Sequence, residues 1–153
     1  MQRSRESLAL LFENAPRFVE RLAMVDASGW EEFFERAEQV ARDMPDDEQV
    51  ELLNAHPRIG APPSSVSALS YREQGYQGDR GSAVLQSRLD RLNAYYEARF
   101  GFRFVVFVNG RSRDAIAEAL AARLAAGRNE ELQRGLSDVI AIARDRQRRT
   151  EGQ

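Results

Sequence analysis

The sequence predicts an all-α fold, a single-domain helical bundle over residues 1–153 with one buried extended connector around residues 102–108. Three observations predict it. Apolar residues recur at helical spacing through most of the chain. Proline, glycine and capping residues divide these segments at intervals typical of helix ends. The run FRFVVFV at 102–108 is the one strand-like stretch, and because it has no partner strand we interpret it as a connector.

The first half of the chain predicts a succession of short helices. Pro16 interrupts the first segment, because proline breaks a helix interior but is accepted where a helix restarts. Ser28-Gly29 precedes the next helix, and Asp46 and Asp47 are the expected N-caps of a short helix that leads to His56. The apolar positions are Leu8, Leu11 and Phe12; Phe18, Val19 and Leu22; Trp30, Phe33, Phe34, Ala37 and Val40; and Val50, Leu52 and Leu53.

Three longer helices follow in the second half. Ser82 is the expected cap of the first, which ends before Gly101. Ser112 is the expected cap of the second, which ends near Gly127, and Asn129 is expected to start the last. Their apolar positions are Leu85, Leu89, Leu92, Tyr96 and Phe100; Ile116, Leu120 and Leu124; and Leu132, Leu136, Val139, Ile140 and Ala143.

Composition excludes several classes of protein. The chain has 42% apolar and 30% charged residues, which is typical of a folded globular protein. No apolar run approaches the roughly 20 residues of a membrane span, and the N-terminal stretch does not resemble a signal peptide, so we expect a cytoplasmic protein with no membrane partner. The absence of cysteine excludes disulfides and thiolate chemistry. The net charge of −2 argues against a nucleic-acid partner.

Candidate catalytic residues begin with His56, the single histidine, in the stretch HPRIG. No phosphate-binding loop, dinucleotide fingerprint or HExxH motif is present, and one histidine without cysteine makes a transition-metal site improbable. We therefore expect no metal. Acid–base chemistry by His56, carboxylates and arginines stays open, beside the alternative that His56 only fills a structural place.

Two further stretches have structural as well as functional interpretations. Ser70 and Glu73 in SYREQ have the spacing of a capping box, in which both side chains satisfy amides at a helix N-terminus. The segment RFGFRFVVFVNGR, taken alone, predicts part of the hydrophobic core.

Taken together, these stretches resemble the decarboxylases of 2-oxo-4-hydroxy-4-carboxy-5-ureidoimidazoline (OHCU) in urate degradation. That family combines an HP motif, a Ser-x-x-Glu-Gln motif some fifteen residues later, an FGFxF-apolar segment after a long helix, and a last helix with Ile-x-x-x-Arg. Here they stand in order as His56-Pro57, Ser70 to Gln74, Phe100 to Phe104 and Ile142 to Arg146. The stretch FENAPRFVERLA is also similar, so the resemblance covers nearly the whole chain.

The resemblance implies cofactor-independent decarboxylation of OHCU to (S)-allantoin in purine catabolism, by a homodimer that takes a small-molecule substrate. It implies that His56 is the catalytic acid–base, that Glu73 is catalytic beside it, and that Glu73 and Gln74 orient the substrate and the imidazole. Arg146 would pair with an anionic part of the substrate. The other implied substrate-binding residues are Pro57, Ser70, Phe104, Val105, Val106, Phe107 and Val108.

The sequence departs from the family at two places, and it leaves two alternatives open. Tyr76 stands where many members have a small residue, and Arg103 stands where proline is common. One alternative is a noncatalytic helical module whose basic end ARDRQRR contacts an acidic partner or nucleic acid. The other is an enzyme of the same fold that acts on another ureido acid.

Overall fold

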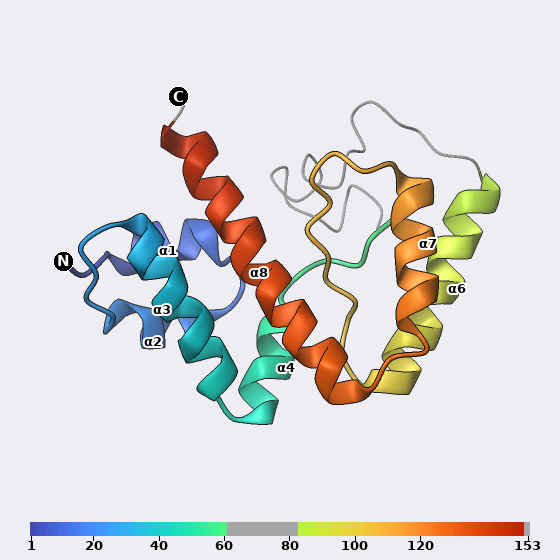
Figure 1. The fold of residues 1–153 in the computed structure, drawn as a ribbon, viewed down its shortest axis with the longest axis horizontal. Coiled ribbons are helices and arrows are strands. Elements are labelled where there is room, and N and C mark those ends of the chain that lie inside the picture. The colour runs from blue at the N-terminus through green and yellow to red at the C-terminus, as the bar shows by residue number, and fades with distance from the viewer. Residues whose placement is uncertain (61–82, 152–153) are drawn as a thin grey trace. The chain divides into compact units, whose positions relative to one another are not determined.

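The computed structural model describes residues 1–60 and 83–151, and this part of the chain contains seven helices and no strand (Figure 1). The predicted all-α class and the extended connector are confirmed. The described residues form two compact units, one of residues 1–56 and 132–151 and the other of residues 57–60 and 83–131. The prediction of a single domain over residues 1–153 stays a prediction.

The first unit begins with α1 (Arg5–Leu11), α2 (Pro16–Ala23) and α3 (Trp30–Asp43). The Ser4 hydroxyl accepts a hydrogen bond from the Ser7 amide and caps α1. Pro16 is the first residue of α2, where its missing N–H costs nothing. Before α3, the amide and the hydroxyl of Ser28 both donate to Glu32, and these hydrogen bonds lower the pKa of that carboxyl to about 2.

Helix α4 (Asp46–Asn54) begins at Asp46, whereas an N-cap at Asp46 would place the first helical residue at position 47. Pro45 is the N-cap, and its carbonyl accepts hydrogen bonds from the amides of Glu48 and Gln49 at 3.0 Å each. Asp46 and Asp47 therefore lie in the first turn, and the prediction that they are caps is wrong. Their charges still suit this end of the helix, because the helix dipole favours anions there.

The core of the first unit is formed by apolar faces of α1 to α4 and of α8 (Arg128–Glu151), whose residues from Leu132 onward belong to this unit. Arg42 on α3 donates to Ser137 on α8 at 2.9 Å, so these two helices pack together. Gly135 lets α8 approach the end of α4, since a Cβ atom there would stand only 3.0 Å from a methyl carbon of buried Leu53. Fully buried residues include Leu8, Leu22, Phe33, Leu52, Leu53 and Leu136.

The second unit contains α6 (Ala83–Phe100) and α7 (Arg113–Arg123), which lie side by side (Figure 1). Gly101 ends α6 with φ +82°, a conformation that favours glycine. Ser112 accepts a hydrogen bond from the Ala115 amide and caps α7, as predicted. The predicted cap Ser82 lies outside the described residues.

The connector at 102–108 runs between α6 and α7 without strand pairing. Its aromatic residues Phe102 and Phe104 pack edge-on against the buried Tyr96, with ring centroids 5.9 and 5.2 Å away. Arg111 donates to the carbonyls of Phe107 and Val108 at 2.7 and 3.2 Å. These bonds satisfy the last two carbonyls of the connector.

None of the helices in residues 1–60 and 83–151 combines the length and the hydropathy needed to cross a membrane.

Candidate active site

His56 lies just beyond the C-terminal end of α4. Its amide donates to the Leu53 carbonyl at 3.1 Å, in the last turn of the helix. Pro57 follows, and a residue before proline is disfavoured in the helical conformation, so the helix ends here. The side chain is partly buried. The sequence thus places its one imidazole at a fixed helix end and not on an exposed helix face.

The ring of His56 is oriented by the backbone of its own helix. Nδ1 lies 3.1 Å from the Leu52 carbonyl oxygen, which only accepts hydrogen bonds. A neutral imidazole that makes this bond carries its proton on Nδ1 and its basic lone pair on Nε2. The helix end therefore selects the tautomer in which Nε2 accepts a proton.

The surroundings of His56 favour its neutral form. Burial is the largest cause, and the positive charge of Arg146 the second, of a shift that lowers the pKa of His56 from 6.5 to about 4. The hydrogen bond to the Leu52 carbonyl raises the pKa and offsets part of this shift. The ring is partly exposed at its surface, but the loss of hydration is still the largest cause. Near pH 7 the side chain is an uncharged base.

This pKa predicts a pH dependence of folding stability. Between about pH 6.5 and pH 4 the unfolded chain binds a proton at His56 that the folded chain does not, so the free energy of unfolding falls as the pH falls through this window. At about 1.4 kcal/mol per pH unit, the loss is at most about 3.5 kcal/mol. Urea unfolding of the wild type and of His56→Asn at pH 7, 5.5 and 4.5 measures it. Parallel pH dependences in the two proteins would contradict the lowered pKa.

Arg146 lies on α8 in the same unit and is 4% exposed. Its Nη1 donates to the Leu11 carbonyl at 3.1 Å, and its Nη2 lies 3.5 Å from Oε1 of Glu13. Leu11 ends α1, so its carbonyl has no partner within that helix, and the guanidinium supplies one. Arg146 thus joins the last helix to the first and brings a cation to the surroundings of His56.

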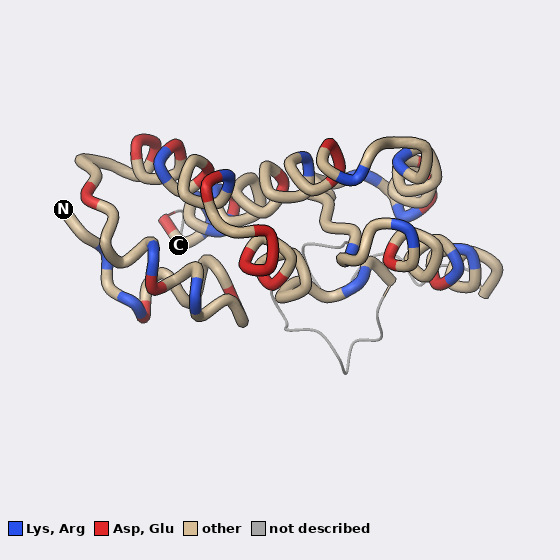
Figure 2. The backbone as a smooth tube through the Cα atoms, turned by 90° about the horizontal axis from the view of Figure 1, so that it is seen from below, with Lys and Arg blue, Asp and Glu red and all other residues tan. Residues whose placement is uncertain are grey.

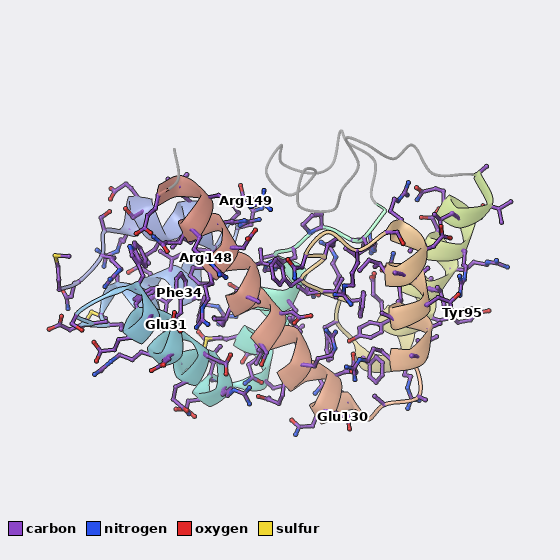
Figure 3. The ribbon with its side chains drawn as sticks, turned by 45° about the horizontal axis from the view of Figure 1, so that its top comes forward. Glu31, Phe34, Tyr95, Glu130, Arg148 and Arg149 are labelled. Atoms are coloured by element: carbon purple, nitrogen blue, oxygen red, sulfur yellow. The ribbon has the colours of Figure 1, made fainter. Side chains whose placement is uncertain are left out.

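Arg144, two residues earlier, points to different partners. It forms an ion pair with Glu31 at 3.3 Å and lies over the ring of Phe34, both on α3. Its side chain is 33% exposed. Figure 3 labels both α3 partners. Of the two arginines, Arg146 is therefore the one whose charge acts on His56, as the predicted motif register requires.

The residues after His56 belong to the second unit and are attached to α6. Arg58 forms a two-bond ion pair with Glu97 at 2.6 and 2.8 Å. The Ile59 carbonyl accepts a hydrogen bond from the side-chain amide of Asn93, and the Gly60 carbonyl accepts one from the side-chain amide of Gln86, both at 2.8 Å. The backbone that follows the histidine is thus fixed over several residues, beginning at Pro57.

The predicted site residues fall into three groups. The structure brings His56 and Arg146 together within the first unit. Pro57 and the connector belong to the second unit, where Phe107 is partly exposed and the buried connector residues are Phe104, Val105, Val106 and Val108. Ser70, Glu73 and Gln74 lie outside the described residues, as does Tyr76.

The sequence analysis missed Glu13 as a partner of Arg146. The two residues are separated by 133 positions, and no local pattern links them. The stretch FENAP was noted only for its likeness to the family. The available signal is the position of Glu13 directly before Asn14-Ala15-Pro16, which leads into α2.

Comparison with known proteins gives a consistent result. The family model described as OHCU decarboxylase matches residues 2–148. The "Uric acid degradation bifunctional protein PucL" of Bacillus subtilis is 31% identical over 144 residues, which are 92% of this chain and 29% of that protein. The "2-oxo-4-hydroxy-4-carboxy-5-ureidoimidazoline decarboxylase" of Haloferax volcanii is 29% identical over 134 residues, which are 87% of this chain and 80% of that protein.

A solved structure shares the fold. The "Crystal structure of OHCU decarboxylase in the presence of (S)-allantoin" superposes with a TM-score of 0.79 over 99% of this chain and 100% of that one, at 21% identity. This match supports the fold, and the family model supports the family. The predicted resemblance is confirmed, and the chain belongs to the OHCU decarboxylase family.

Proposed function

We propose that the chain catalyses the cofactor-independent decarboxylation of OHCU to (S)-allantoin in urate catabolism, with His56 as the acid–base group. Membership of the family supports the reaction. The observation that carries the role of His56 is a partly buried imidazole, uncharged near pH 7, that is held by the Leu52 carbonyl and influenced by a buried arginine.

The substrate can hold the electrons that decarboxylation releases. Its carboxylate and hydroxyl share one carbon, beside a C=N carbon that carries the ureido group. When the carbon–carboxylate bond breaks and CO2 leaves, the electron pair forms a C=C bond to the former imine carbon. The π pair of the C=N bond then moves onto the ring nitrogen, which takes a proton from the medium. The product of this step is an enol, and the step needs no external electron acceptor.

Conversion of the enol to allantoin requires one proton to move from oxygen to carbon. Neutral His56 accepts the hydroxyl proton at Nε2, and the imidazolium then delivers a proton to the former imine carbon. A pKa below neutrality keeps the imidazole uncharged at the start and lets its conjugate acid give up the proton readily, although it weakens the base that accepts the hydroxyl proton. Delivery to one face of a fixed substrate would set the handedness of the product.

Other residues would bind the substrate, as the resemblance implies. Arg146 would pair with an anionic group, a role suited to its planar guanidinium. Glu73 and Gln74 would orient the hydroxyl and ureido edges, together with Ser70. Pro57 and residues 104–108 would form an apolar wall that excludes water.

We also propose that the whole chain is one OHCU decarboxylase domain, that it is cytoplasmic and that it forms a homodimer. The exposed face of α6 supports self-association, because Val84 and Tyr95 are 78% and 65% exposed there, and Tyr95 projects away from the helix (Figure 3). Sedimentation of wild type and Tyr95→Glu tests this surface. A dimer that persists unchanged in the variant would show that the chains associate elsewhere.

Charge distribution favours the enzyme over a nucleic-acid-binding module. In the basic stretch ARDRQRR, Arg146 is buried, Arg144 pairs with Glu31, and Arg149 pairs with Asp145 at 2.8 Å. Acidic and basic residues are interspersed along the helices (Figure 2). A mobility shift at physiological salt tests the alternative, since phosphate binding weakens steeply as salt rises.

The decisive experiment generates OHCU from urate with uricase and hydroxyisourate hydrolase, and follows the circular dichroism of allantoin. We expect the chain to accelerate the appearance of an optically active product, and EDTA to leave the rate unchanged. Racemic product at the spontaneous rate would overturn the proposal. It would leave the alternative of another ureido acid, which can be tested with the same protein.

A further inference from the structure

The turn between α1 and α2 has a fixed shape. Asn14 has φ +60°, a left-handed conformation that asparagine adopts more readily than most residues. Ala15 precedes Pro16 and has φ −124° and ψ 66°, outside the helical conformation that a residue before proline avoids. Glu13 lies directly before this constrained pair, so the direction of its side chain is set by the turn.

Arg146 enters this turn with both of its terminal nitrogens. Nη1 reaches the Leu11 carbonyl, and Nη2 lies 3.5 Å from the Glu13 carboxylate. Arg146 is almost wholly buried, whereas the Glu13 side chain is 32% exposed. A buried cation is tolerated only with partners of this kind, because the loss of its hydration is otherwise uncompensated.

We propose that Glu13 is a positioning residue, which fixes the guanidinium of Arg146 in the active site and balances its charge toward His56. The kinetic part of this inference rests on the proposed function, and the electrostatic part does not. Among the described residues, three charged or titratable groups come together here: His56 at the end of α4, Arg146 from α8 and Glu13 from the turn. On α4, the carboxylate of Glu51 is paired with Arg17 at 2.7 Å.

The arrangement has two consequences for catalysis. A guanidinium held at both Nη atoms has its plane fixed before substrate arrives, so binding does not have to order it. The carboxylate also offsets part of a positive charge that would otherwise disfavour the imidazolium formed during proton transfer. Glu13 acts on the reaction through Arg146 and is not assigned contact with the substrate.

The test uses Glu13→Gln and Glu13→Ala in the full chain, with Glu31→Gln as the matched control. Glu31 pairs with an α8 arginine at a similar distance, 3.3 Å, but that arginine is Arg144. Because the chain has one histidine, the imidazole resonances in an NMR titration report His56 alone. Far-UV circular dichroism at each pH establishes that the titrating protein is folded.

We expect both Glu13 variants to lower the pKa of His56 further, by about 0.5, because the variants remove one counter-charge of Arg146. Arg146→Gln should shift the pKa in the opposite direction, and Glu31→Gln should leave it unchanged. The KM for OHCU should rise roughly 2- to 10-fold in Glu13→Ala. The rise should be smaller in Glu13→Gln, which keeps the side-chain length and an acceptor for Arg146.

An unchanged His56 pKa in folded Glu13→Gln would overturn the electrostatic role, and an unchanged KM in folded Glu13→Ala would overturn the positioning role. If Glu13→Ala does not fold, the similarly shaped Glu13→Gln still reports both quantities. If the wild type does not turn over OHCU, the proposed function fails, while the titration still decides whether Glu13 controls the charge around His56.

Discussion

Replacing His56 with asparagine should lower the catalysed rate of allantoin formation by about 100- to 10,000-fold in a protein that remains folded. Asparagine has similar bulk and can still donate a hydrogen bond to the Leu52 carbonyl, which His56 reaches through Nδ1. It cannot accept and return a proton near neutral pH. The expected loss is therefore specific to proton transfer.

Thermal melts and initial rates of optically active allantoin formation should be measured on the same preparations. Near pH 7, the variant should melt close to the wild type, because asparagine can keep the hydrogen bond to the Leu52 carbonyl. A purely structural histidine would give the opposite pattern, with a lower melting temperature and nearly intact turnover. Such a result would return His56 to the structural interpretation and remove the basis of the proposed mechanism.

Arg146→Ala should lower activity by roughly 10- to 100-fold, the range expected for losing hydrogen bonds to a charged group, whereas Arg144→Ala should leave it nearly unchanged. Arg146 is buried and acts on His56, while Arg144 pairs with Glu31 on α3. Substitution of Arg146 also removes the partner that Arg146 provides for the Leu11 carbonyl, so a lower melting temperature is expected too.

Assays well below the melting temperature separate the two effects of Arg146. Arg146→Lys adds a second comparison, because lysine keeps the charge but cannot hold Leu11 and Glu13 with one planar group. Loss of activity in Arg144→Ala with activity retained in Arg146→Ala would show that the motif register of the last helix is displaced by about half a turn.

Local patterns predicted the helices well because most of the signals lie within a few residues of one another. The Ser112 cap, the Gly101 helix end and the apolar faces all belong to this class. The expected caps Asp46 and Asp47 were wrong because the Pro45 carbonyl accepts the first helical hydrogen bonds, and acidic residues are equally favoured in a cap and in a first turn.

The candidate site was predictable only in part. The resemblance identified His56 and Arg146, but no pattern in the sequence indicates that Glu13 meets Arg146, since that contact depends on how α1 and α8 pack. The lowered pKa of His56 has the same origin, because its burial and its nearby cation both arise from tertiary structure. The boundary between the two compact units lies between His56 and Pro57, and no change in amino-acid composition indicates it.

The close approach at Gly135 constrains how the gene can change. Gly135 and Arg146 are 11 positions apart (146 − 135), which at about 100° per residue places them on the same side of α8, where they meet Leu53 and Leu11. One inserted or deleted codon between them would rotate Arg146 by about 100° relative to Gly135. We therefore expect length differences among members of the family to fall outside this stretch, even where its individual amino acids vary freely.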